Sequence, residues 1–189
     1  MTKESIFAGF GGQGVLMMGY VAAVSAMKDG KHVTYIPSYG AEVRGGTANC
    51  TVVISDQEIY SPVSSRPDYI VVMNKPSLLK YEPVIKKGGI LFINSSLIDS
   101  DPTRTDIDII KIPANDMVRD LGTDKILNMI MIGAFMGKTK IISMDSVLIG
   151  LNEIFADKKS SVIELNRKAI EMGAKCISEG VKNENCHTN

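Results

Sequence analysis

The segment from Ser5 to Ile36 constrains the fold more strongly than any other part of this sequence. It predicts, in order, a buried strand, a glycine-rich turn, a helix and a second strand, at Ser5–Ala8, Gly9–Gly14, Val15–Met27 and His32–Ile36. Small and apolar residues recur at helical spacing in the third part, and Gly30 after it is typical of a helix end. A strand, a helix and a strand in such close succession form a right-handed crossover, which implies that the two strands pair in parallel.

The next segment differs, because its connection is too short to hold a crossover helix. Asn49–Ile54 is rich in β-forming residues, Ser55–Gln57 is typical of a turn, and Glu58–Tyr60 predicts a short return strand. A connection this short joins only antiparallel strands, so the sheet is predicted to be mixed. Further apolar runs predict three later strands, at Tyr69–Met73, Ile90–Asn94 and Ile107–Ile112.

Helices dominate the rest of the chain. Four of them are predicted near Pro76–Ile85, from Asn115 to Gly122, over Lys125–Gly137 and from Ser143 to about Phe155. A last helix is predicted to begin near Ser161 and to end near Gly180. Ser161 and Glu164 have the spacing of a capping box at the start of the last helix. The pattern predicts a three-layer α/β/α sandwich on a mixed, mainly parallel sheet, with a helical C-terminal part. We expect residues 1–181 to form one domain and the polar residues 182–189 to form a disordered tail.

Charge and cysteine content argue against several classes of protein. Lys and Arg together number 21, as do Asp and Glu, so the sequence lacks the basic excess typical of nucleic-acid binding. The three cysteines, Cys50, Cys176 and Cys186, form no CxxC pair, which argues against a disulfide framework or a four-thiolate metal site. No apolar run reaches the roughly 20 residues that span a bilayer, and no signal pattern opens the chain. We therefore expect a cytoplasmic protein without a membrane partner.

The turn at Gly9–Gly14 has the strand and helix context of a dinucleotide-binding fingerprint, in which a helix N-terminus favours a phosphate. The match is incomplete. Such a site needs an acidic residue at the end of the second strand to hold the ribose, and Pro37–Tyr39 stands there instead. The P-loop pattern fails because no Lys-Ser/Thr pair follows Gly14. Binding of NAD or FAD stays open as an alternative.

A second glycine-rich loop follows the second predicted strand. Arg44 lies beside Gly45, Gly46 and Thr47, and an arginine next to exposed amides and a hydroxyl can hold a carboxylate or a phosphate. Alternatively, Glu42 and Arg44 pair with each other or with a partner chain and only order the loop. Two glycine clusters joined by one helix and one strand suggest a shared rim where something binds.

Other candidate residues favour a structural interpretation. His32 opens a strand without a ligand pattern around it, and His187 lies in the predicted tail. Cys50 falls in a predicted strand with no histidine nearby, which favours a small buried apolar residue. No Ser-His-Asp set or paired-carboxylate spacing is found, so the sequence predicts neither a catalytic residue nor a metal ligand in this chain.

Seven segments in this order and spacing carry a family resemblance: Gly9–Val15, Pro37–Gly40, Glu42–Cys50, Ser55–Pro62, Val72–Asn74, Asn94–Ser96 and Ile112–Asn115. Together they resemble the gamma subunit of 2-oxoacid:ferredoxin oxidoreductases, in the pyruvate/ketoisovalerate oxidoreductase catalytic-domain family. The resemblance runs to about Leu165 and is nearest to the 2-oxoglutarate and branched-chain 2-oxoacid types. The small subunit of indolepyruvate:ferredoxin oxidoreductase and a stand-alone nucleotide-binding module are the alternatives.

The resemblance implies a function that this chain performs only within a complex. Enzymes of the family oxidatively decarboxylate a 2-oxoacid to an acyl-CoA and reduce ferredoxin, using thiamine diphosphate, Mg²⁺ and iron–sulfur clusters. The resemblance places these cofactors on thiamine-binding alpha and beta subunits and a ferredoxin-like delta subunit. It implies a structural role near coenzyme A for the gamma subunit, and no activity for the isolated chain.

The two loops thus supply candidate residues for binding coenzyme A phosphates or for contacting the catalytic subunits. They are Gly11, Gly12, Gln13, Gly14, Ser38, Tyr39, Glu42, Arg44, Gly45, Gly46 and Thr47.

Overall fold

A computed structural model describes residues 1–39, 47–61, 65–119 and 121–180 of the chain. Within these ranges the strands are β1 Thr2–Phe10, β2 His32–Tyr39, β3 Thr47–Ser55, β4 Tyr69–Val72, β5 Ile90–Asn94 and β6 Asp108–Ile112. The α-helices are α1 Val15–Lys28, α2 Lys75–Tyr81, α3 Ala114–Arg119, α4 Leu127–Thr139, α5 Met144–Ile154 and α6 Ser160–Gly180. Two short 3₁₀ helices are η1 Glu82–Val84 and η2 Asp124–Ile126.

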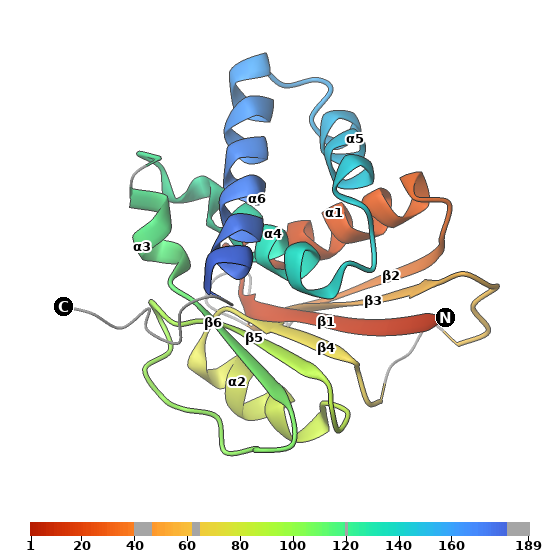
Figure 1. Ribbon diagram of the computed structural model, residues 1–189, viewed down its shortest axis with the longest axis vertical. Coiled ribbons are helices and arrows are strands. Elements are labelled where there is room, and N and C mark those ends of the chain that lie inside the picture. Colours follow the sequence, from red (N-terminus) through yellow and green to blue (C-terminus); the bar gives the residue numbers. More distant parts are fainter. Residues whose placement is uncertain (40–46, 62–64, 120, 181–189) are drawn as a thin grey trace.

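The strands form one sheet in the order β2-β3-β1-β4-β5-β6 (Figure 1). β1 pairs parallel with β4, β4 with β5, and β5 with β6, whereas β3 is antiparallel to both β1 and β2. Helices cover both faces of this sheet, so the predicted α/β/α sandwich on a mixed, mainly parallel sheet is confirmed. The C-terminal part is helical, as expected.

Two details of the predicted topology are wrong. β1 and β2 run in the same direction, but they are not neighbours, because β3 lies between them. Glu58–Tyr60 is not a strand, and β3 pairs along its length with β1 and β2 instead of with a short return strand. β3 is buried on both sides at its end, so it needs two long neighbours, which a three-residue return strand could not supply.

The second strand also runs further than predicted. β2 continues through Pro37 to Tyr39, and Pro37 lies opposite Cys50 of β3. Proline lacks a backbone N–H, but β2 is at the edge of the sheet, where one side needs no partner strand. The edge position therefore explains why Pro37 does not end the strand.

The alternation of side chains along the strands divides the core into two layers. Phe7 and Phe92 face a large cluster formed with α1, α4, α5 and α6, while Ile6 and Leu91 face a smaller cluster under α2. Phe135 of α4 is the centre of the large cluster. Its ring lies 5.3 Å from that of Phe7, 5.7 Å from that of Tyr69 and 5.5 Å from that of Phe92, in edge-to-face contacts.

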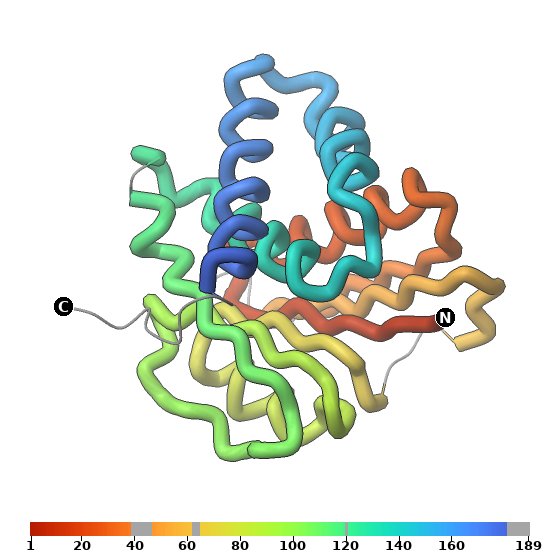
Figure 2. Tube along the Cα trace, in the orientation of Figure 1, coloured from red at the N-terminus to blue at the C-terminus, as the bar shows by residue number. Residues whose placement is uncertain are grey.

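Helices α4 and α6 cross at very short range because glycines face each other's backbone. A Cβ atom added to Gly133 would lie 2.0 Å from the carbonyl oxygen of Ile170, and one added to Gly173 would lie 2.0 Å from that of Ile130. Figure 2 follows the chain from β1 in the middle of the sheet to α6, which extends away from the sheet beside α5. The glycines hold this long terminal helix against the most apolar helix of the molecule.

The ends of the helices confirm some sequence signals and contradict others. Ser143 caps α5 by accepting a hydrogen bond from the backbone N–H of Ser146, as predicted, and Asn74 caps α2 in the same way. The capping box is wrong, because α6 already begins at Ser160 and Glu164 forms an ion pair with Arg167. Asn115 lies inside α3 rather than at its cap.

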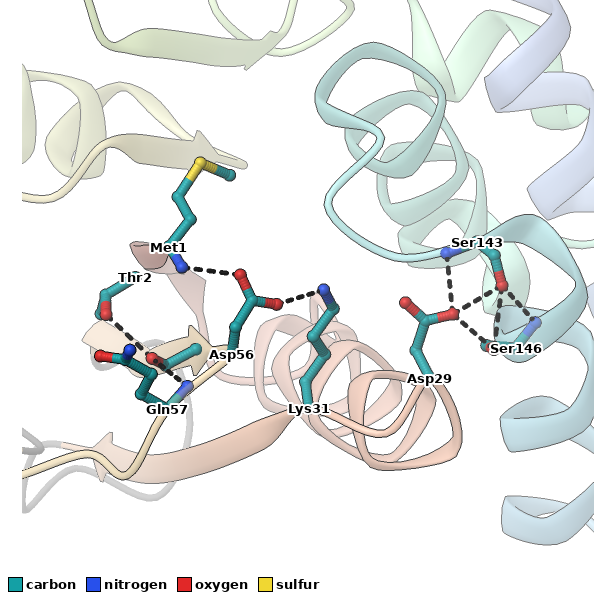
Figure 3. Close-up of polar contacts among 9 residues, drawn as sticks. Met1, Thr2, Asp29, Lys31, Asp56, Gln57, Ser143 and Ser146 are labelled. Carbon is teal, nitrogen blue, oxygen red and sulfur yellow. Dashed lines mark hydrogen bonds and ion pairs between the residues drawn. The ribbon is translucent and has the colours of Figure 1, made fainter.

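Polar contacts tie the end of α1 to the start of α5 and the loop before β2 to the end of β3 (Figure 3). The carboxylate of Asp29 accepts hydrogen bonds from the hydroxyls of Ser143 and Ser146 at 2.7 Å and 2.8 Å. Partial burial raises the pKa of Asp29, but these hydrogen bonds outweigh burial and lower it. Lys31 forms an ion pair with Asp56 at 2.5 Å. In the described part of the chain no helix is long and apolar enough to cross a bilayer.

Candidate functional site

A pocket of about 200 Å³ lies at the carboxyl ends of β1 and β4. These neighbouring parallel strands continue in opposite directions: β1 leads into α1 on one face of the sheet, and β4 leads into α2 on the other. In open α/β sheets such a reversal opens a crevice at the carboxyl ends of the strands, and ligands bind there. The topology of this fold therefore places a candidate binding site here.

The turn between β1 and α1 forms one wall of the pocket and requires glycine at two positions. Gly12 and Gly14 have φ angles of 97° and 72°, in the left-handed region. Gly14 is also the N-cap of α1, and a Cβ atom there would lie 2.6 Å from the amide nitrogen of Asn128. No side chain caps the helix and its first turn has no acidic residue, so its backbone N–H groups present positive potential.

The side-chain amide of Gln13 holds the turn in place by hydrogen bonds. Its Oε1 accepts hydrogen bonds from the backbone N–H of Phe10 at 2.7 Å and from the side-chain amide of Asn74 at 3.1 Å. Its Nε2 donates to the carbonyl oxygen of Met73 at 3.3 Å. A side chain on Gly9 would collide with Gln13, since the added Cβ would lie 2.7 Å from Oε1. The bulky amide that departs from the dinucleotide fingerprint therefore ties the end of β1 to the end of β4.

Side-chain amides surround the rest of the pocket. Asn115 and Asn128 line it together with Gln13, and Asn94 at the end of β5 donates to Asn115 Oδ1 at 2.8 Å. Asn128 is only 7% exposed, and its Nδ2 donates to the carbonyl oxygen of Gly14 at 3.4 Å. The Oδ1 atoms of Asn94 and Asn128 are buried without a hydrogen-bond partner among the described residues. An unpaired buried acceptor is costly, which is typical of a site that completes its hydrogen bonds with a ligand or water.

Charges of both signs complete the lining. Lys125 and Asp124, in the 3₁₀ helix before α4, also line the pocket. The site therefore combines helix N-terminal amides, neutral amide side chains and one cation beside one anion. Such a set can hold a polar ligand with a phosphate or a carbonyl group by hydrogen bonds.

The second predicted loop starts and ends at the same edge of the sheet. Phe10 at the end of β1 lies opposite Thr47, and Tyr39 at the end of β2 lies opposite Ala48. Both glycine-rich segments thus leave the sheet on one rim. Glu42, Arg44, Gly45 and Gly46 lie outside the described residues. Ser38 and Gly11 are exposed near the rim, and a ligand or partner role for all of these residues stays a prediction.

The strand order argues against a dinucleotide site. In the dinucleotide-binding fold the ribose is held by an acidic residue on the strand next to β1. Here β3 occupies that position and presents its amino end, while β2 lies one strand further away, about 10 Å from β1 at ordinary strand spacing. The fingerprint turn therefore stands in a sheet that cannot place a ribose-binding carboxylate from β2 beside it.

Cys50 is structural, as predicted. It is fully buried on β3, and its Sγ donates to the carbonyl oxygen of Val15 at 3.4 Å. Burial raises the pKa of the thiol to about 12, so it does not ionise near neutral pH. Within the described ranges, no cluster of three or more His, Cys, Asp or Glu residues has the arrangement of a metal site.

Sequence reasoning did not assign Asn94, Asn115 and Asn128 to a binding pocket. Asn128 had a recognisable signal, because it is a lone polar residue near the start of the most apolar helix, α4. A buried amide in such a helix needs a partner, and here the partner is the turn at Gly14. Asn94 and Asn115 lie in segments that carried the family resemblance, but their spacing alone does not predict contact.

Known proteins resemble this chain over nearly its whole length. A family described as pyruvate ferredoxin/flavodoxin oxidoreductase matches residues 4–176. Ketoisovalerate oxidoreductase subunit VorA of Methanothermobacter marburgensis is 34% identical over 184 residues, which cover 94% of this chain and 37% of VorA. This chain thus spans little more than a third of that relative. 2-Oxoglutarate synthase subunit KorC of the same organism is 33% identical. The match covers 96% of this chain and 100% of KorC.

Solved structures resemble the fold as well. The gamma subunit of a keto/oxoacid ferredoxin oxidoreductase from Geobacter sulfurreducens is 28% identical, with a TM-score of 0.79, covering 94% of this chain and 99% of that one. A 2-oxoglutarate:ferredoxin oxidoreductase from Magnetococcus marinus, with 2-oxoglutarate, coenzyme A and succinyl-CoA bound, has a TM-score of 0.85. It is 21% identical, and the match covers 100% of this chain and 33% of that one, so it bears on the fold alone.

Proposed function

The chain belongs to the pyruvate ferredoxin/flavodoxin oxidoreductase family, and from this membership we propose that it is the gamma subunit of a multisubunit 2-oxoacid:ferredoxin oxidoreductase. The observation that carries the proposal is the match over the whole length of KorC, a separate subunit of similar size. The complex would take a 2-oxoglutarate or branched-chain 2-oxoacid, release its carboxylate as carbon dioxide, transfer the acyl group to coenzyme A and reduce ferredoxin. We place it in the cytoplasm.

We assign thiamine diphosphate, Mg²⁺ and the iron–sulfur clusters to alpha, beta and delta partner subunits. A four-cysteine cluster needs four thiolate ligands. This chain has three cysteines, and one of them, Cys50, is buried in the core with a raised pKa. The chain's own residues thus suit a supporting role in the complex rather than electron transfer.

The pocket fits one part of coenzyme A better than it fits the other cofactors. The uncapped N-terminus of α1 and the ammonium group of Lys125 suit a phosphate, and the side-chain amides of Asn115 and Asn128 suit an amide-bearing chain. When bound, coenzyme A supplies the thiol that accepts the acyl group. These residues would bind and orient it, and they take no proton in the reaction. The same features could instead contact the catalytic subunits, which is the second role we propose.

Native mass spectrometry of the complex tests the proposal directly. We expect this chain to assemble with a thiamine-binding subunit pair and a ferredoxin-like chain, and the assembly to turn over a 2-oxoacid with coenzyme A and ferredoxin. The isolated chain should show no turnover. Turnover by the lone chain, or a stoichiometric iron–sulfur cluster in it, would overturn the assignment. A thermal-shift screen with NAD, FAD and ATP addresses the nucleotide-binding alternative, and we expect no shift.

The variant Arg44→Ala distinguishes the two proposed roles of the second glycine-rich loop, which are binding of coenzyme A and contact with a partner subunit. If the loop binds coenzyme A, the variant complex should assemble normally and its KM for coenzyme A should rise. If the loop contacts a partner subunit, assembly itself should weaken. Loss of one charged, hydrogen-bonded contact of this kind costs about 2–5 kcal/mol. Unchanged assembly and unchanged kinetics would remove Arg44 from the site.

A further inference from the structure

A second concave surface lies at the amino ends of β4 and β5, at the opposite end of these strands from the candidate site. It is a groove of about 590 Å³, and we call it the basic groove. Its lining comes from three segments that precede β4, β5 and β6: Ser65 and Arg66, Pro83 to Lys87, and Arg104. The candidate site above lies at the carboxyl ends of these strands, so the two surfaces are separated by the length of the sheet.

Hydrogen bonds hold the walls of the groove in place. Glu82 Oε1 accepts from the backbone N–H groups of Thr103 and Arg104 at 2.5 Å and 2.8 Å, which fixes the loop before β6 against η1. The Arg104 guanidinium donates to the carbonyl oxygen of Ile85 at 2.5 Å. It also grips both carboxylate oxygens of Asp106 at 2.8 Å and 2.7 Å. A groove built in this way keeps its shape without a ligand.

The groove carries more positive charge than its carboxylates balance. Asp68 is shared by two ammonium groups, since its Oδ1 lies 3.0 Å from Lys3 Nζ and 3.2 Å from Lys86 Nζ. The Asp106 carboxylate already forms an ion pair with Arg104. The positive charge of Lys87 also acts on this carboxylate, from a greater distance. Arg66 and Lys87 form no ion pair with the residues that the structure describes. A molecule with zero formal net charge therefore concentrates unbalanced cations here.

One wall of the groove is apolar. Pro83 and Val84 lie beside the cations, and Val84 is 39% exposed. A small anion would contact the cations and leave this apolar surface in water, and the groove is much larger than one such ion needs. A chain that alternates carboxylates with apolar side chains would use both features, because each kind of side chain meets its complement.

We propose that the basic groove binds an acidic segment of a partner polypeptide. The carboxylates of the segment face Arg66, Lys86 and Lys87, and an apolar side chain of the segment packs on Pro83 and Val84. The inference does not depend on the function proposed above, since it rests on this chain's own surface at the far edge of the sheet.

Fluorescence anisotropy with a synthetic peptide tests the groove on the full chain. The probe is a labelled peptide of alternating glutamate and leucine, and its counterpart has lysine in place of each glutamate. We expect saturable binding of the acidic peptide alone, weakened by added salt. The double variant Arg66→Glu/Lys87→Glu should bind the acidic peptide at least about tenfold more weakly. Circular dichroism should show an unchanged fold, because both side chains are exposed.

Lys158→Glu/Lys159→Glu is the matched control. These exposed lysines lie between α5 and α6 and give the same change in net charge away from the groove. We expect the control to keep its affinity. An equal loss in both double variants would mean general attraction instead of a site, and would overturn the proposal. So would displacement of the peptide by an equal concentration of inorganic phosphate, or no saturable binding by the unmodified chain at low ionic strength.

Discussion

Gln13 is the residue whose side chain joins the ends of β1 and β4, and its loss should weaken the turn. Gln13→Ala leaves the backbone N–H of Phe10 and the amide of Asn74 without their acceptor. We expect the free energy of unfolding to fall by about 1–3 kcal/mol in urea denaturation. Gln57→Ala is the control, because the Gln57 side chain is exposed, and it should leave stability unchanged. Equal stability of the two variants would remove the structural role of Gln13.

Gly12 and Gly14 share a left-handed backbone but differ in the space around them. Both have positive φ angles, so alanine at either position pays the cost of a left-handed backbone, about 1–2 kcal/mol. An added Cβ on Gly12 meets open space, whereas one on Gly14 meets Asn128 at 2.6 Å. Thermal unfolding of Gly14→Ala should therefore show a clearly larger loss than that of Gly12→Ala. If the two losses match, Asn128 moves aside freely and does not brace the turn.

At the scale of elements, the crossing of α4 and α6 gives the sharpest prediction. Gly173→Ala would place a Cβ 2.0 Å from the carbonyl oxygen of Ile130, so the helices must separate. We expect overpacking to cost about 1–3 kcal/mol or more, measured by chemical denaturation. Gly180→Ala, at the end of the same helix, meets nothing within 4 Å and should be neutral or slightly stabilising. A neutral Gly173→Ala would contradict the close crossing.

The elements themselves follow from local patterns, but their pairing does not. Apolar runs located each of the six strands, and glycine and serine signals located the ends of α1 and α5. The short turn after Ser55 suggested a hairpin, yet β3 is buried along its end and pairs with two long strands that precede it, the neighbouring β2 and the more distant β1. Likewise, the Ser161 and Glu164 spacing fits a cap locally, while Arg167 one turn later offers Glu164 a charged partner. The burial of β3 decided the first case, and a local ion pair on the surface of α6 decided the second.

Only one part of the candidate site, the glycine turn, could be predicted from the sequence. The glycine turn at Gly11–Gly14 was evident because few other patterns end a strand and start a helix. Asn115 of α3 and Asn128 of α4 line the pocket beside this turn, and Asn94 of β5 donates a hydrogen bond to Asn115. These segments are distant in sequence, and only the tertiary fold brings them together.

At the scale of the whole molecule, Asp68 links three segments and makes stability depend on pH. It binds Lys3 and the Glu4 backbone N–H on β1, and Lys86 before β5. Burial raises the pKa of Asp68, but these hydrogen bonds outweigh burial, so the folded pKa lies below the ordinary value of 3.8. The stabilisation is therefore present above pH 3.8 and is lost as the pH falls through the lower folded pKa.

Asp68→Asn tests this dependence. At neutral pH we expect the variant to be about 1–3 kcal/mol less stable than the unmodified chain in chemical denaturation. The difference should shrink as the pH falls from 3.8 through the lower folded pKa, because the carboxyl group of the unmodified chain then loses its charge. Asp157→Asn, in an exposed turn, should show no such trend. A difference that stays constant through acid pH would show that charge on Asp68 does not stabilise the fold.

The central place of β1 affects how the chain is made. β1 is synthesised before both of its neighbours and is apolar along Ile6–Ala8, whereas β3 and β4 are completed only at residues 55 and 72. Until then both edges of β1 offer unpaired backbone groups to any other nascent chain. Synthesis therefore passes through an interval in which premature association competes with folding, and slower translation between β1 and β4 would lengthen that interval.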